Sequence, residues 1–343
     1  LRRHYPRWLL VTMVSLLLVA NIINLGADLA AMGAAVQLLV GGPVALYTLL
    51  FGAICVIAEI WLPYERYASI LKWTTLSLFS YVAVVLVAQV PWGTALTSLI
   101  VPQFEWSSAY AMAVVAILGT TISPYLFFWQ AAQEIEEQKR HKAKPLYVTP
   151  KEAGPELQRI RIDTLTGMAF SSIVSLAIVF ATAATLHANG VRDIETSAQA
   201  AEALRPIAGD LAFALFAVGI IGTGMLAVPV LAGSAAYAVT EMVGLKGSLA
   251  AKPNKARFFY SVIVVTTLLG VGLQFVGIDP AKALYWAAVV NGVLAAPLMA
   301  VMMLIARNRK AMHSLTLGTR ATITGWAATA VMAVATIVFF ATL

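Results

Sequence analysis

Three hydroxyl side chains stand next to a proline inside an apolar segment that is long enough to span a membrane. Thr120, Thr121 and Ser123 precede Pro124, and Tyr125 follows it. Proline lacks a backbone amide and its ring clashes with the carbonyl four residues earlier, so this pattern predicts a break in the helix. Unpaired backbone groups survive at membrane depth only inside protein or beside a watery cavity, and interrupted helices form the substrate sites of transporters. The pattern therefore predicts a binding site for a transported substrate.

Three further polar side chains in or next to apolar segments are candidates for the permeation path or its surroundings. Asp28 is the strongest ionisable candidate, because an acid inside a membrane is costly and usually functional. It could instead form a structural link to a polar neighbour. Asn291 could line the path or join two helices through a hydrogen bond, and we favour the hydrogen bond. Gln130 follows the break and could close an inner vestibule.

The hydroxyl groups near the proline also have a structural alternative. Thr120, Thr121 and Ser123 could donate to helix carbonyls one turn earlier and so relieve a kink. We favour the binding site, because a kink alone does not call for three polar residues around one proline. The acidic residues at the end of the same segment are interpreted as solvated charge: Glu134, Glu136 and Glu137.

The composition predicts the class of protein. Hydrophobic residues make up 60% of the chain and charged residues 11%, and the mean hydropathy is +0.84. These values exclude a soluble domain and predict an all-α polytopic membrane protein. The single cysteine, Cys55, excludes a disulfide within the chain, and we expect no redox cofactor or zinc site. Because residue 1 is leucine, we also expect natural sequence before it.

Stretches of about 20 apolar residues predict the membrane spans. The first stretch is long and contains the polar residues Asn21 and Asp28, and we interpret it as one long helix rather than two short spans. The nine predicted spans are 8–40, 43–62, 71–90, 109–133, 162–187, 211–240, 258–277, 281–306 and 322–342.

Basic residues predict the orientation of these spans. If residues 1–7 are cytoplasmic, 20 of the 23 basic residues fall in inward-facing segments, and only Arg192, Arg205 and Lys282 face outward. This asymmetry follows the positive-inside rule and places the C-terminus outside. It also accounts for the net charge of +7 without a nucleic-acid partner. The expected partners are a lipid bilayer, most simply a bacterial inner membrane, and the substrate, whereas the oligomeric state is left open.

Several segments resemble the NRAMP family of divalent metal transporters. Residues 21–33 resemble the third helix of that family, and residues 119–125 resemble its broken sixth helix; the similarity continues through 215–221 and 231–233. The resemblance implies a LeuT-type inverted-repeat fold, with residues 1–343 forming a single, N-terminally incomplete transmembrane transporter domain. It places this chain at helices three to eleven of eleven. The first helix of the family carries an Asp-Pro-Gly-Asn motif that supplies half of the ion ligands, and this motif lies outside the sequence.

The break departs from the family pattern in a way that bears on ion choice. Transition-metal members have Ala-Thr-Val-Met-Pro-His where this chain has residues 120–125, so Ser123 replaces a methionine. A thioether is a soft ligand for manganese and iron, whereas a hydroxyl offers hard oxygen. Magnesium releases its waters reluctantly, and the short Ser123 side chain leaves room for them. The resemblance thus implies the NRAMP-related magnesium transporter branch, with Thr120 and Ser123 as metal ligands and with Mg²⁺ carried and Mn²⁺ also accepted.

A second departure concerns proton coupling. Proton-coupled members have a histidine and a second acid where this chain has Tyr125 and Ala31. Tyrosine titrates at about pH 10 and alanine never, so we expect uncoupled uptake driven by the membrane potential, which yields roughly 4.6 kcal/mol for two charges at 100 mV. The alternatives are a proton-coupled Mn²⁺ or Fe²⁺ transporter with an altered site and, more distantly, a non-transporting membrane sensor. We expect no enzymatic activity, since Ser123 has no histidine in its own segment to serve as a base.

Overall fold

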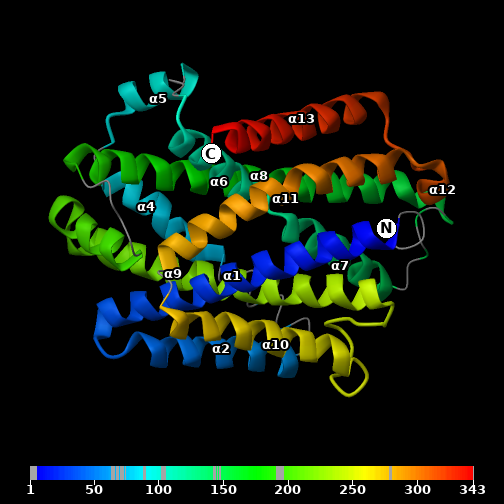
Figure 1. The fold of residues 1–343 in the computed structure, drawn as a ribbon, viewed down its shortest axis with the longest axis horizontal. Helices are drawn as coiled ribbons and strands as arrows, with labels where there is room; N and C mark the ends of the chain where they lie inside the picture. The colour runs from blue at the N-terminus through cyan, green and yellow to red at the C-terminus, as the bar shows by residue number, and fades with distance from the viewer. Residues whose placement is uncertain are drawn as a thin grey trace.

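Long apolar helices dominate the computed structural model of the chain (Figure 1). The structure describes residues 6–62, 66, 69, 73, 75–87, 90–101, 106–141, 144, 146, 148–190, 197–277 and 280–342. All the regular elements among these residues are helices. Their bounds, in chain order, are α1 Arg7–Val40, α2 Val44–Trp61, η1 Thr75–Leu78, α4 Phe79–Val87, α5 Trp92–Ile100, α6 Ser108–Thr121, α7 Pro124–Arg140, α8 Pro150–Thr185, η2 His187–Asn189, α9 Ser197–Val243, α10 Arg257–Leu273, η3 Gln274–Val276, α11 Pro280–Arg307, α12 Arg309–Met312 and α13 Thr319–Thr342.

Within the described residues, eight helical segments are long and apolar enough to cross a membrane. They correspond to eight of the nine predicted spans. The remaining one, 71–90, lies partly outside the described residues, which include η1 and α4 of that stretch. The first predicted span is a single helix, α1, which ends at Gly41 with a positive φ of 76°. The interpretation of this stretch as one long helix is therefore confirmed.

α1 lies inside the bundle and packs against α2, α9, α10 and α11 (Figure 1). Asn21 does not interrupt this helix. Its buried Nδ2 donates to the Leu231 carbonyl at 3.0 Å and to Ser234 Oγ at 2.8 Å, which ties α1 to α9. On another side, a Cβ on Gly26 would lie 2.5 Å from the Gly270 carbonyl oxygen, so the absence of a side chain lets α1 and α10 approach closely.

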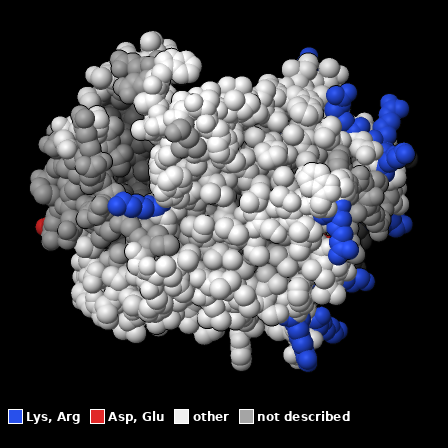
Figure 2. Space-filling view, viewed as in Figure 1, with Lys and Arg blue, Asp and Glu red and all other residues white. Residues whose placement is uncertain are grey.

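Lysine and arginine side chains gather at one end of the helices (Figure 2). This is the end where α1 begins and α12 lies, whereas α13 runs away from it toward the C-terminus (Figure 1). The long middle of the visible face carries hardly any charged side chain (Figure 2). An uncharged belt with basic residues at one end is the distribution expected for helices that cross a bilayer in one orientation.

Candidate functional site

The segment that contains Pro124 forms two helices rather than one. α6 ends at Thr121 and α7 begins at Pro124. Between them, Ile122 has φ -114° and ψ 56°, and Ser123 has φ -71° and ψ 125°, so neither residue is helical. Proline suits the first position of α7, because an amide there has no partner in the helix and the fixed φ is already helical. The predicted break is present at these two residues.

The three hydroxyl groups around the break all donate to backbone carbonyls of α6. Thr120 Oγ1 lies 2.9 Å from the Ala116 carbonyl oxygen. Thr121 Oγ1 donates to the carbonyls four and three residues earlier at 3.0 and 3.1 Å. Ser123 Oγ lies 2.9 Å from the carbonyl oxygens of both Gly119 and Thr120. The hydroxyl groups thus make the hydrogen bonds to helix carbonyls that the structural alternative predicts. Each hydroxyl oxygen still has lone pairs that can coordinate a cation.

Ser123 and Thr120 differ in their surroundings. Ser123 is only 3% exposed, whereas Thr120 lies on the exposed side of α6. Among the described residues, no backbone amide donates to the carbonyls of Thr121 and Ile122. These carbonyls stand at the C-terminal end of α6, where the helix dipole is negative, and unwound carbonyls of this kind coordinate cations in transporters. The break thus offers hydroxyl and carbonyl oxygens.

A cavity of about 500 Å³ opens from the break between α7 and α8. Thr121, Ser123 and Gln130 line it, so the structure brings three of the sequence-predicted residues together. Gln130 Nε2 donates to Thr164 Oγ1 of α8 at 2.8 Å. Glu134 and Asp163 line the same cavity. This cavity leads from the broken helix along α7, whose far end carries basic residues.

Asp28 lies within electrostatic range of two phenol groups, those of Tyr81 in α4 and Tyr125 in α7. Thr223 of α9 donates to Tyr81 Oη through a long contact of 3.5 Å. Asp28 of α1 is thus within electrostatic range of phenol groups from α4 and α7, and one of these, Tyr125, is also a predicted residue. Sequence reasoning missed Tyr81 and Thr223, because neither has a local pattern that distinguishes it from other polar residues in apolar segments.

Asn291 is buried in α11, and among the described residues its Oδ1 has no hydrogen-bond partner. The next residue, Gly292, packs directly on the helix that leads to the break. A Cβ on Gly119 would overlap the Ala288 carbonyl oxygen and the Gly292 backbone. Asn291 therefore lies in the helix that supports α6, and its role in the permeation path remains a prediction.

Two buried acids were not recognised as such in the sequence. Glu59, in the second predicted span, is 2% exposed, and neither carboxylate oxygen has a hydrogen-bond partner among the described residues. The sequence did offer one signal of this burial, the position of Glu59 inside an apolar run. Glu136 is 5% exposed and accepts from Tyr237 Oη at 3.2 Å, so its interpretation as solvated charge is wrong. The reason is that α9 covers this side of α7, which the local sequence does not reveal.

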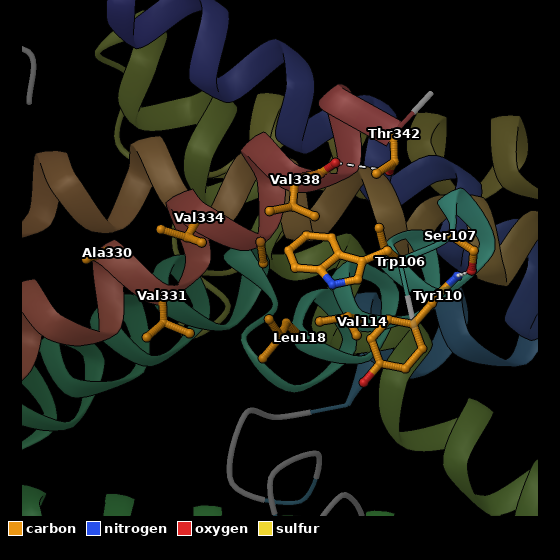
Figure 3. A pocket seen from close by; sticks show the side chains of 12 residues that line it. Trp106, Ser107, Tyr110, Val114, Leu118, Ala330, Val331, Val334, Val338 and Thr342 are labelled. Carbon is orange, nitrogen blue, oxygen red and sulfur yellow. Dashed lines mark hydrogen bonds between the residues drawn. The ribbon is translucent and has the colours of Figure 1, made fainter. Parts of the chain in front are cut away.

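An apolar cavity of about 510 Å³ lies between α6 and α13 (Figure 3). Trp106, Val334 and Val338 point into it, and aliphatic or aromatic side chains form most of its wall. Its hydroxyl groups at Ser107 and Thr342 are bonded to nearby backbone (Figure 3). This cavity offers no set of oxygens for an ion. Among the described residues, no three His, Cys, Asp or Glu side chains come together to hold a metal.

Comparison with known proteins identifies the family. The family model described as "Natural resistance-associated macrophage protein-like", Nramp, matches residues 1–342. A "Divalent metal cation transporter MntH" of Caldanaerobacter subterraneus subsp. tengcongensis is 25% identical over 234 residues, which is 68% of this chain and 51% of that protein. The protein of the same name in Mesorhizobium japonicum is 27% identical over 205 residues, covering 56% of this chain and 42% of that protein.

The chain spans about half the length of these curated relatives. The family match, in contrast, extends over nearly every residue, and the regular elements of the described residues are helices, with a broken helix at Pro124. This chain belongs to the Nramp family, whose members are transporters with the LeuT-type fold.

Proposed function

We propose that this chain forms the ion-conducting part of a transporter that carries Mg²⁺, also accepts Mn²⁺, and works without proton coupling. The relatives are named divalent metal cation transporters, which supports the substrate class. The residues at the broken helix support the narrower choice of ion. Thr120 and Ser123 are proposed as ligands, with Thr121, Pro124 and Tyr125 shaping the path beside them.

The observation that carries the choice of ion is the Ser123 hydroxyl in the cavity wall. A serine at this position supplies hard oxygen, and the neighbouring carbonyls of Thr121 and Ile122 supply more of the same kind. Hard oxygen ligands suit magnesium and manganese alike and give no preference for softer metals. Six water molecules need roughly 180 Å³ at about 30 Å³ each. The cavity of about 500 Å³ has room for an ion that keeps its hydration shell.

The absence of proton coupling is proposed from Ala31 and Tyr125. Ala31 is buried in α1, and Tyr125 stands at the start of α7, so neither position offers a group that exchanges protons near neutral pH. With the basic end of the helices in the cytoplasm of a bacterial cell, the inside-negative membrane potential would drive cations inward. The amino-terminal end of α1 then faces the cytoplasm, and the C-terminus faces outward.

One observation favours the alternative, a proton-coupled transporter. Asp28 is an acid within electrostatic range of Tyr81 and of Tyr125, the residue that follows Pro124. An acid next to the ion path could carry a proton as the ion passes. This alternative shares the site and the substrate class with the first proposal and differs in what accompanies the metal.

The test is uptake of Mn²⁺ into vesicles that contain the full-length natural protein, with Mg²⁺ as competitor and a set membrane potential. Under the proposal, Mg²⁺ suppresses Mn²⁺ uptake when the two ions are present at similar concentrations. Uptake also increases as the vesicle interior becomes more negative. A protein whose Mn²⁺ uptake persists in a large excess of Mg²⁺ would contradict the proposed ion choice. Uptake without any response to potential would contradict the proposed driving force.

A further inference from the structure

A second cavity, of about 790 Å³, lies where the end of α2 and the end of α7 meet the loop before α10. Its wall includes three basic residues, Lys139 and Arg140 from α7 and Lys252 from the loop. Trp61 and Tyr260 complete the wall from α2 and α10. The cavity is at the end of the molecule where lysines and arginines gather (Figure 2).

The cavity carries an excess of positive charge. Its acid, Glu136, is nearly buried and already accepts a hydrogen bond from Tyr237. Arg140 has Glu137 nearby at 4.0 Å, a distance that makes a weak exposed pair. Among the described residues, no carboxylate oxygen lies within 4.0 Å of the Lys139 or Lys252 ammonium groups. An anion that enters the cavity therefore meets cations from two sides.

The loop that forms one wall is held in place by tyrosine side chains. Tyr260 Oη lies 3.2 Å from the Leu249 carbonyl oxygen and 3.0 Å from that of Ala251. The Leu249 amide donates to Tyr237 Oη at 3.1 Å. These bonds join the loop to α9 and α10, so the wall that carries Lys252 is ordered before any ligand arrives. A preformed site loses less entropy on binding than one that must fold around its ligand.

We propose that this cavity binds the phosphate group of an anionic ligand at the cytoplasmic membrane surface. The Lys139 and Lys252 ammonium groups supply point charges for a phosphate, and Arg140 adds a third positive charge to the same wall. Trp61 is 79% exposed at the same cavity, and such aromatic side chains mark the level of lipid headgroups. Basic pockets between helices on the cytoplasmic side are suited to anionic headgroups. The two sources of this chemistry are a phospholipid headgroup and a free phosphate compound.

Binding here would act on the broken helix from its far end. Lys139 and Arg140 are in the last turn of α7, which begins at Pro124 beside the candidate ion site. A phosphate held between these residues and Lys252 ties α7 to the loop before α10. The proposed phosphate site consists of residues outside the candidate ion site, so it does not depend on which ion the protein carries.

The experiment compares lipid binding by two matched double variants of the full-length protein in detergent, followed by native mass spectrometry. The first variant, Lys139→Gln with Lys252→Gln, removes two charges from the cavity. The control, Lys246→Gln with Lys255→Gln, removes two exposed lysines that do not line it. Each cation near an anionic lipid contributes roughly 1 kcal/mol, so the first variant should bind phosphatidylglycerol about thirtyfold more weakly. The control should change by less than about threefold, because its charges lie outside the site.

A second arm separates the two sources. Inorganic phosphate is added to the lipid-free protein, and the unfolding temperature is measured for the natural protein and both variants. Stabilisation that is lost only in the cavity variant identifies a free phosphate ligand, whereas loss of phosphatidylglycerol binding alone identifies a lipid headgroup. If both double variants bind phosphatidylglycerol and phosphate as the natural protein does, the cavity lysines do not hold the ligand and the proposed site is wrong. If both variants lose binding equally, general surface charge accounts for the result and the proposed site is again wrong.

Discussion

Ser123→Met tests the proposed ion choice at the residue that carries it. Ser123 is buried in the wall of the cavity, and its hydroxyl is the group that a Mg²⁺ ion or one of its waters would contact. A hydrogen bond to a charged group contributes about 1.5–3 kcal/mol, so loss of the hydroxyl should weaken Mg²⁺ binding about 10- to 150-fold. The longer thioether also fills space that bound water needs. Mn²⁺ should be affected less, because it accepts the sulfur as a ligand.

The substitution has a structural cost that the controls must separate from selectivity. Ser123 Oγ also donates to two carbonyls at the end of α6 at 2.9 Å, and both lose this bond in Ser123→Met. Ser123→Ala loses the same bonds without adding sulfur, so it should reduce transport of both ions in similar proportion. Ser123→Thr keeps a hydroxyl and should keep the ratio of Mg²⁺ to Mn²⁺ uptake of the natural protein.

The assay is the ratio of Mg²⁺ to Mn²⁺ uptake in vesicles that contain the full-length protein. The ratio should fall at least tenfold in Ser123→Met, a change of about 1.4 kcal/mol, and remain within about threefold in the two controls. An unchanged ratio in the methionine variant would show that residue 123 does not contact the ion or its waters. The reasoning from ligand softness would then be refuted.

Three further outcomes are expected. A pH-sensitive dye inside vesicles should show no acidification during metal entry, because Tyr125 occupies the position of a proton-exchanging histidine, and acidification that tracks uptake would show a proton path. Gly119→Ala should lower the free energy of unfolding by about 1–3 kcal/mol, and with it the unfolding temperature, because the added Cβ overlaps α11. Gly272→Ala is the control and should not lower the unfolding temperature, because a Cβ there has open space around it. Tyr237→Phe should lower the free energy of unfolding by about 1–3 kcal/mol, because buried Glu136 loses the hydrogen bond from Tyr237. An unchanged thermal unfolding curve would contradict that contact.

Local patterns predicted the elements of the fold well. Eight spans follow from apolar runs alone, because a segment of that length must bury its backbone polar groups in a helix when it crosses a bilayer. The break at Pro124 follows from the missing amide and the ring of one residue. Basic residues in the loops predicted which ends of the helices lie together, and the structure shows them gathered at one end (Figure 2).

The sequence by itself determined the class of protein, the helices and the position of the break, because these depend on composition and on neighbours within one or two turns. Only the tertiary structure decided which polar groups meet. It turned Ser123 toward a cavity and left Thr120 exposed, placed Asp28 near Tyr81 and Tyr125, and buried Glu136 against a tyrosine 101 residues away. Such contacts depend on how separate helices rotate and align against one another, and that alignment is set by the packing of the whole bundle.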